Sequence, residues 1–309
     1  MISRRNIRIK VMQTLYSSTA SDGSLSREQA IKVLDNHLDQ GRQLFIFLAH
    51  LLTETARYAE TDSRQRASKH LPTAQDLNVN TKLAGNELLW RILELPSYQS
   101  AVKELKPELQ LNTDWVRKLY TELAETEIYK TYISNAFRDK KEEKSILEFI
   151  FTDLMLPNEE LTGYIEELYV HWDDDSEMMN LLMLNFLNKP HTYNFQHFIS
   201  EEKLKYAKDL LLSVIDKEEM CNEYIKAKLQ NWDPERTALL DMILMRMGIC
   251  EFLYFETIPP KVTINEYIDL AKEYSTPQSG HFVNGILDSI HKDFIRENKL
   301  HKITFNKPK

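Results

Sequence analysis

The chain has few of the residues that break helices and shape tight turns. Only 7 glycines and 10 prolines occur in 309 residues. Turn-rich β folds and glycine-rich phosphate-binding loops depend on such residues, so the composition argues against both. Because 42% of the residues are hydrophobic, the chain can bury a large core, as one large domain or two ordinary ones. With turn-rich β folds and glycine-rich phosphate-binding folds disfavoured, a helical fold is the remaining interpretation.

Cysteine is scarcer still, and long apolar runs are missing. Cys221 and Cys250 are the two cysteines, and no secretion signal is visible at the N-terminus, so we expect two reduced core thiols rather than a disulfide. No apolar run approaches the roughly 18 to 20 residues that span a bilayer. We therefore expect a soluble, cytoplasmic protein without membrane contact.

Motifs for catalysis and for cofactors are missing as well. The chain has no phosphate loop, no dinucleotide fingerprint, no metal-binding cysteine pair and no two-histidine helix motif. His191 and His197 do not share a helix face at their spacing, so we expect surface histidines. Asp173, Asp174 and Asp175 stand where a helix should begin, and we prefer this interpretation to a divalent-cation site. No enzyme activity, cofactor or metal is predicted.

What the chain does have is an uneven distribution of charge. The formal net charge is −8, yet residues 1–20 and residues 291–309 each carry +4. The first stretch, SRRNIRIKVMQTLYSS at 3–18, holds four cations and no acid. Clustered Lys and Arg suit a localised contact with a polyanion, because each bound phosphate releases a counterion. The alternative is that two basic ends only keep the chain soluble.

Apolar residues recur at helical spacing along most of the chain. In the first segment Ile7, Val11 and Leu15 repeat every four residues, and Ser3 is the expected N-cap. Residues 26–70 predict one long helix, or two that join at Gly41. The fold class predicted is all-α, with at least nine helices.

The last third of the sequence carries the clearest signals for helix ends. Asp233 is the expected N-cap of a helix that has Pro234 at its first position. Thr263 and Glu266 stand at the spacing of a capping box. A final helix is expected to begin near Ser279.

Three windows in the middle of the chain are weakly similar to one another, namely 119–133, 151–165 and 211–225. Aligned without gaps, they place apolar residues together at two positions and a glutamate at a third (Leu119, Phe151 and Leu211; Leu123, Met155 and Ile215; Glu127, Glu159 and Glu219). A repeated helix–turn–helix unit would explain this pattern. Helical sequences also mimic one another without common origin, so both explanations stay open.

The two ends of the chain resemble the NusB family of bacterial transcription antitermination factors. The similar segments are RRNIRIKVMQTLYS near the N-terminus and, much later, YAKDLL, NWDPERTALLDMILMRMGICEFLYF and IPPKVTINEYIDLAKEYSTPQSGHFVNGILDSI. They cover roughly residues 1–20 and 203–295. KVTINEYIDLAK and FVNGILD, in this order and at this distance, make the resemblance specific.

The resemblance implies an all-helical fold of two packed three- to four-helix bundles and a function without catalysis. Members of the family bind a short single-stranded element of ribosomal RNA leader transcripts together with the ribosomal protein NusE. The complex then joins RNA polymerase and other Nus factors to suppress termination. An RNA-binding transcription antitermination factor for ribosomal RNA operons is therefore expected.

The family's functional positions can be transferred residue by residue. Two sets follow from the resemblance, one for RNA and one for the protein partner: the RNA-binding residues Arg4, Arg5, Arg8, Lys10, Tyr16 and Phe282, and the partner-binding residues Asp241, Arg246 and Glu251. Cations on phosphates and aromatic rings under splayed bases are the contacts that single-stranded RNA needs. Tyr16 and Phe282 could instead be core residues, and Arg246 could form a structural ion pair with Asp241 or Glu251.

The sequence also departs from the family. Asn6 and Lys10 make the basic run less rich in arginine, and His281 stands where lysine is common in the family, which implies weaker RNA affinity.

The expected organisation is a basic first helix at 1–20, an inserted helical region with possible repeats at 21–202, a C-terminal helical bundle at 203–295 and a basic tail at 296–309. The alternative function is a helical protein-interaction scaffold that no longer binds RNA. A third hypothesis, part of an RNA methyltransferase, is weak because no cofactor-binding domain is visible.

Overall fold

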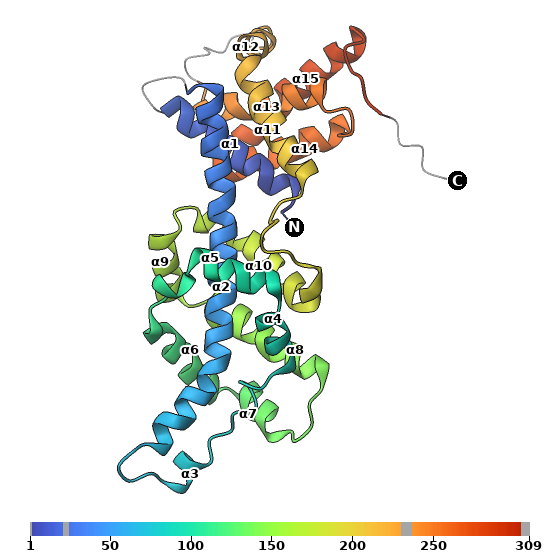
Figure 1. Ribbon diagram of the computed structural model, residues 1–309. Helices are drawn as coiled ribbons and strands as arrows, with labels where there is room; N and C mark the ends of the chain where they lie inside the picture. Colours follow the sequence, from blue (N-terminus) through green and yellow to red (C-terminus); the bar gives the residue numbers. More distant parts are fainter. Residues whose placement is uncertain (1, 21–24, 230–236, 304–309) are drawn as a thin grey trace, which may run out of the picture. The chain divides into compact units, whose positions relative to one another are not determined.

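The computed structural model describes residues 2–20, 25–229 and 237–303, and all regular elements in these ranges are helices (Figure 1). The all-α prediction is confirmed. Two compact units divide the chain. Unit 1 is Met1–Ile2 with Asp39–Phe198, and unit 2 is Ser3–Leu38 with Ile199–Lys309. We describe each unit by itself.

Unit 2 is built around one central helix, α13 (Leu239–Tyr254), which packs against five others. These are α1 (Arg4–Ala20), α11 (Glu201–Asp216), α12 (Glu218–Lys226), α14 (Pro260–Tyr274) and α15 (Ser279–Arg296). Residues on all sides of α13 are buried, including Leu244, Met247 and Phe252. A helix that is apolar all round belongs at the centre of a bundle, and α13 lies there.

The helix ends of unit 2 agree with the sequence in part. The N–H of Asn6 donates to Ser3 Oγ at 3.1 Å, so Ser3 caps α1 as predicted. Helix α15 begins at Ser279, also as predicted. The capping box at Thr263 is wrong, because α14 already begins at Pro260 and Thr263 lies within it. The predicted cap at Asp233 lies outside the described residues.

Unit 1 contains most of α2 (Arg27–Ala67), which runs through Gly41 as one continuous helix. Of the two alternatives for residues 26–70, the single long helix is therefore correct. The other elements of unit 1 are mostly short helices: α3 (Ala74–Leu77), α4 (Glu87–Leu93), α5 (Pro96–Leu105), η1 (Pro107–Leu109), α6 (Thr113–Glu125), α7 (Glu127–Ser134), α8 (Lys140–Phe149), the π-helix η2 (Ile150–Met155), α9 (Glu159–Leu168), α10 (Trp172–Asn188) and η3 (Pro190–Thr192).

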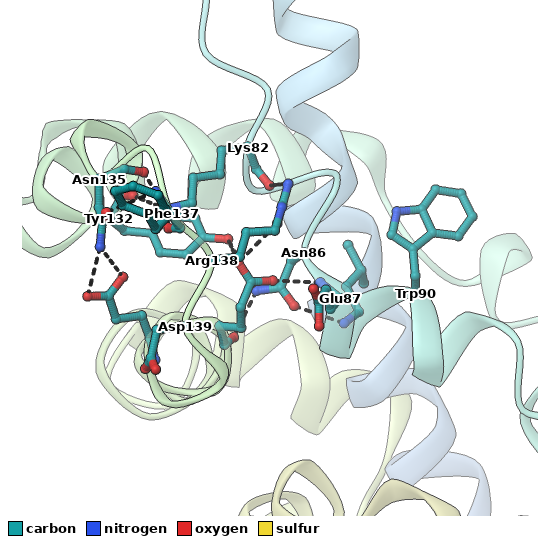
Figure 2. Close-up of polar contacts among 12 residues, drawn as sticks. Lys82, Asn86, Glu87, Trp90, Tyr132, Asn135, Phe137, Arg138 and Asp139 are labelled. Carbon is teal, nitrogen blue, oxygen red and sulfur yellow. Dashed lines mark hydrogen bonds and ion pairs between the residues drawn. The ribbon is translucent and has the colours of Figure 1, made fainter.

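A polar cluster fixes the connection between α7 and α8 (Figure 2). The ammonium of Lys82 donates to the backbone carbonyls of Tyr132, Asn135 and Phe137 at 2.7, 2.7 and 3.1 Å. Its Nζ also lies 4.4 Å from the centre of the Tyr132 ring. Beside it, Arg138 donates to the buried carboxylate of Glu143 at 3.0 Å. Unit 1 thus fixes an irregular loop with charged side chains.

Several smaller expectations can now be compared with the structure. Cys221 and Cys250 are buried free thiols, as expected. Asp173, Asp174 and Asp175 lie in the first turn of α10, which agrees with their interpretation as helix-start acids. No group of three or more His, Cys, Asp and Glu side chains suited to a metal occurs among the residues that the structure describes. None of the described helices is both long and apolar enough to cross a bilayer.

The three similar windows share a local structure. In each, one helix ends, a short break follows, and a second helix begins at Glu127, Glu159 or Glu218. The aligned residues Leu119, Phe151 and Leu211 are all buried. The common helix–turn–helix form explains the shared pattern, whether or not the windows have a common origin.

Candidate nucleic-acid interface

The four cations of α1 divide into an exposed pair and a buried pair. The side chains of Arg4 and Arg5 are 42% and 35% exposed. Arg8 and Lys10, by contrast, are only 2% and 1% exposed. The expectation of a single basic run open to phosphates therefore needs correction. Arg8 and Lys10 lie in the middle of α1, where nearly every residue from Ile7 to Leu15 is buried, whereas Arg4 and Arg5 lie near the start of the helix.

Arg8 belongs to a buried polar network centred on Glu251 of α13. Its Nε donates to Glu251 Oε1 at 2.7 Å, and its Nη1 lies 3.1 Å from Glu266 Oε2. Glu251 is completely buried and accepts further hydrogen bonds from the hydroxyls of Tyr206 and Tyr267. The hydroxyl of Thr263 donates to its other oxygen at 2.9 Å. Glu251 thus joins α1, α11 and α14 to α13.

The opposite charges of Arg8 and Glu251 stabilise each other inside the network. Burial alone would lower the pKa of Arg8, but the charge of Glu251 and its hydrogen bonds with Arg8 act in the opposite direction, and the pKa is raised. Burial, reinforced by the charge of Glu251, raises the pKa of Tyr206 and of Tyr267 well above the ordinary value. Arg8 is therefore a cation and both tyrosines are neutral donors at physiological pH.

Each exposed arginine of α1 is already in contact with an acid of unit 2. Arg4 lies 3.2 Å from Glu202 of α11, and its guanidinium lies 5.8 Å from the centre of the Tyr206 ring. Arg5 lies 2.6 Å from Glu273 of α14. The basic N-terminal stretch is thus neutralised within unit 2. The sequence gives no local signal for these acids, because they stand 198 and 268 positions away.

The two aromatic candidates are both accessible. Tyr16 is 48% exposed and lies eleven residues beyond Arg5, about 16 Å along α1 at 1.5 Å per residue. Phe282 is partly exposed in the first turn of α15. Helix α15 begins five residues after the end of α14, the helix that carries Glu273. Tyr16 lies toward the C-terminal end of α1.

The three residues expected to contact a protein partner are mostly engaged inside unit 2. Glu251 is completely buried, so it does not present a surface. Asp241 is also buried and accepts a hydrogen bond from Ser279 Oγ at 2.8 Å. Arg246 forms an ion pair, but its partner is Glu218 at 2.7 Å rather than Asp241 or Glu251. Asn222 accepts a second hydrogen bond from Arg246 at 2.8 Å.

A comparison with known proteins identifies the family of the C-terminal part. Residues 167–292 match the NusB family. The chain is similar to the transcription antitermination protein NusB of Salinibacter ruber, with 41% identity over 97 residues, or 31% of this chain and 61% of that protein. The NusB proteins of Chloroherpeton thalassium and Methylacidiphilum infernorum are 43% and 46% identical over 100 and 83 residues, or 47% and 58% of their lengths. These matches take up 31% and 27% of this chain.

Among solved structures, the chain is similar to NusB of T. maritima. The identity is 30%, the match covers 34% of this chain and 77% of that chain, and the TM-score is 0.31. The matched stretches span less than two thirds of each of the three curated relatives. The family match starts at residue 167 and leaves out α1, so the resemblance at residues 1–20 stays a prediction.

Proposed function

We propose that this chain, which carries a NusB family domain at residues 167–292, is an RNA-binding transcription antitermination factor without enzyme activity. The proposed RNA is a single-stranded leader element of ribosomal RNA transcripts. The proposed partners are the ribosomal protein NusE and, through it, the antitermination complex on RNA polymerase, which would place the chain in the cytoplasm. The family match is the observation that carries this proposal.

The proposed RNA contacts are the accessible part of the predicted set. Arg4 and Arg5 offer guanidinium groups to phosphates, and Tyr16 and Phe282 offer aromatic faces to bases. Arg8 has a different role in this proposal. Its ion pair with Glu251 fixes α1 on unit 2 and so holds the exposed arginines in place. Lys10 is also buried and is not a direct contact in this proposal.

In this proposal, two of the three predicted partner residues support the contact with NusE indirectly. Asp241 and Glu251 are buried, so they would shape the partner surface by fixing α13 rather than by touching the partner. Arg246 remains partly accessible, with 14% of its side chain exposed. The proposal therefore assigns direct partner contact to Arg246 alone among the three.

The proposal is tested by fluorescence anisotropy of a labelled single-stranded ribosomal leader RNA, with and without NusE, at two salt concentrations. Binding that weakens with salt and strengthens with NusE is expected. Arg4→Ala with Arg5→Ala should abolish most of the binding. The matched control is Lys292→Ala with Arg296→Ala, which removes two exposed cations from the far end of α15. No binding to RNA with NusE present would refute the proposal.

A second function is favoured by one observation in unit 2. All four cations of α1 have partners within the protein or lie buried, so none is an unengaged, exposed charge. Such an arrangement suits a helical scaffold with a NusB-like fold that binds proteins and no longer binds RNA. The two functions are separated by the same titration, because a scaffold binds no RNA at any salt concentration.

A further inference from the structure

We infer that Glu202 and Glu273 compete with RNA phosphates for Arg4 and Arg5, and thereby set the RNA affinity of unit 2. This inference rests on the proposed function. It concerns residues outside the predicted RNA-binding set, on two helices that the sequence does not connect with α1. In the structure these carboxylates occupy the same guanidinium groups that phosphate oxygens would take.

The geometry supports an exchange of partners. Arg5 and Glu273 approach to 2.6 Å with 35% and 48% of their side chains exposed. Arg4 and Glu202 approach to 3.2 Å with 42% and 81% exposed. Ion pairs at this exposure are weak, because water solvates both charges nearly as well. A phosphate can therefore displace either carboxylate without breaking a buried contact.

The position of Glu273 is not explained by its own helix. It lies in the last turn of α14, where the helix dipole disfavours a negative charge. Its contact with Arg5 is the favourable interaction that the structure gives it. Glu202, in contrast, lies in the first turn of α11, where an acid stabilises the helix. The position of Glu202 is thus explained by its own helix, whereas the position of Glu273 is explained by its ion pair with Arg5.

The competition has a signature in the salt dependence of binding. A phosphate that binds an arginine releases a cation from the RNA, and an arginine held by a carboxylate neutralises its phosphate less often. Neutralising the carboxylate removes this competition. For single-stranded RNA the slope of log affinity against log salt should then steepen, by at most about 0.7 for each further phosphate that is neutralised.

The test uses Glu202→Gln, Glu273→Gln and the double variant in the full chain, with the labelled leader RNA. Each single change should raise affinity by up to about fivefold, as expected for an exposed pair, and should steepen the salt slope. The control is Glu201→Gln, which removes the same charge from the same turn of α11, next to Glu202. It should leave the salt slope unchanged.

The outcomes separate this inference from the proposed function. Wild-type binding that depends on Arg4 and Arg5 but does not change in the double variant would overturn the inference alone. An equal gain in Glu201→Gln would also overturn it, because net charge and not partner exchange would be the cause. Wild-type binding that tightens in the double variant, with no change in Glu201→Gln, would support the inference. No binding by wild type or double variant would overturn both.

Discussion

At the residue scale, the same side-chain type takes opposite roles within one helix. Arg5 and Arg8 stand three residues apart on α1, yet one contacts an exposed acid and the other a fully buried one. The difference comes from the position along α1, because Arg5 lies near the exposed start of the helix and Arg8 lies one turn further in, where it contacts Glu251. Charges at such depth are kept only when paired, because burying an unpaired charge is very costly.

Glu251 should therefore be critical for the stability of unit 2. Replacing Glu251 with Ala leaves Arg8 and the hydroxyls of Tyr206 and Tyr267 without their common acceptor. We expect the free energy of unfolding to fall by about 3–5 kcal/mol, measured by urea denaturation. Glu256→Ala, an exposed acid nearby, should change it by less than about 0.5 kcal/mol. Equal effects of the two changes would contradict the role assigned to Glu251.

Tyr16 provides the test of base stacking. Because the ring is 48% exposed, Tyr16→Ala should leave the unfolding midpoint unchanged and weaken RNA binding by about 1–3 kcal/mol for one stacked base. Anisotropy and thermal denaturation measure the two effects. Tyr254→Ala removes an equally exposed tyrosine, at 45%, from α13 and serves as the control. A large loss of stability would instead identify Tyr16 as a core residue.

At the element scale, charged side chains donate hydrogen bonds to backbone carbonyls at helix ends and in loops. Lys82 does this for three carbonyls at the end of α7 and the start of the next loop (Figure 2). Lys302 binds the C-terminal end of α13 in the same way, because its ammonium donates to the carbonyls of Glu251 and Phe255 at 2.8 and 2.7 Å. A helix end leaves its last carbonyls without intrahelical donors, and such lysines supply a donor to them.

Removing the ammonium of Lys82 should open the loop. Lys82→Met leaves the carbonyls of Tyr132, Asn135 and Phe137 without their shared donor, and we expect a loss of about 2–3 kcal/mol in unfolding free energy. Hydrogen exchange of residues 132–143 should rise in parallel. Lys103→Met, at an exposed lysine of α5, is the control and should have little effect. Unchanged exchange in Lys82→Met would show that the loop does not need this lysine.

Lys302 should respond to pH in an unusual range. Burial lowers its pKa to about 8 from the ordinary value of 10.5. A depressed pKa means that the folded protein binds this proton more weakly than the unfolded chain does. Its contribution to stability should therefore increase as the pH rises from about 8 to 10.5 and be lost as the pH falls through about 8. An NMR titration of the Lys302 side chain, assigned with Lys302→Met, should give a midpoint near pH 8, and a midpoint near 10.5 would contradict this.

At the scale of the whole molecule, the two units differ in charge. Residues 39–198 contain 17 basic and 26 acidic residues, a net charge of −9, whereas the remaining residues contain 22 and 21, a net charge of +1. The acidity of the chain thus belongs to unit 1, and unit 2 is nearly neutral. A unit without net negative charge is the better candidate for contact with RNA.

The two units should also lose structure separately, because each has its own buried core. Glu251→Gln should raise hydrogen exchange in peptides from α13 and α14, while peptides from α6 and α10 keep their protection. Lys82→Met should give the reverse pattern. Hydrogen-exchange mass spectrometry of the full chain measures both. Loss of protection in both units from either change would show that they unfold as one cooperative body.

The helical fold, the cap of α1 at Ser3 and the resemblance to the NusB family could all be predicted from the sequence. These features depend on neighbours along the chain, where spacing of 3 to 4 residues and local hydrogen bonds decide the structure. The sequence also placed Arg4, Arg5 and Tyr16 near the two ends of the first helix, and these side chains are at least partly exposed, because the burial of α1 is concentrated between Ile7 and Leu15.

The partners of the charged side chains of α1 could not be predicted from the sequence, because they depend on tertiary packing. Arg8 and Glu251 are 243 positions apart, and Arg5 and Glu273 are 268 apart. No local pattern encodes such pairs, because they depend on how α1, α11 and α14 pack around α13. The sequence therefore predicted one open basic edge, whereas packing buries two of its cations and places an acid against each of the others.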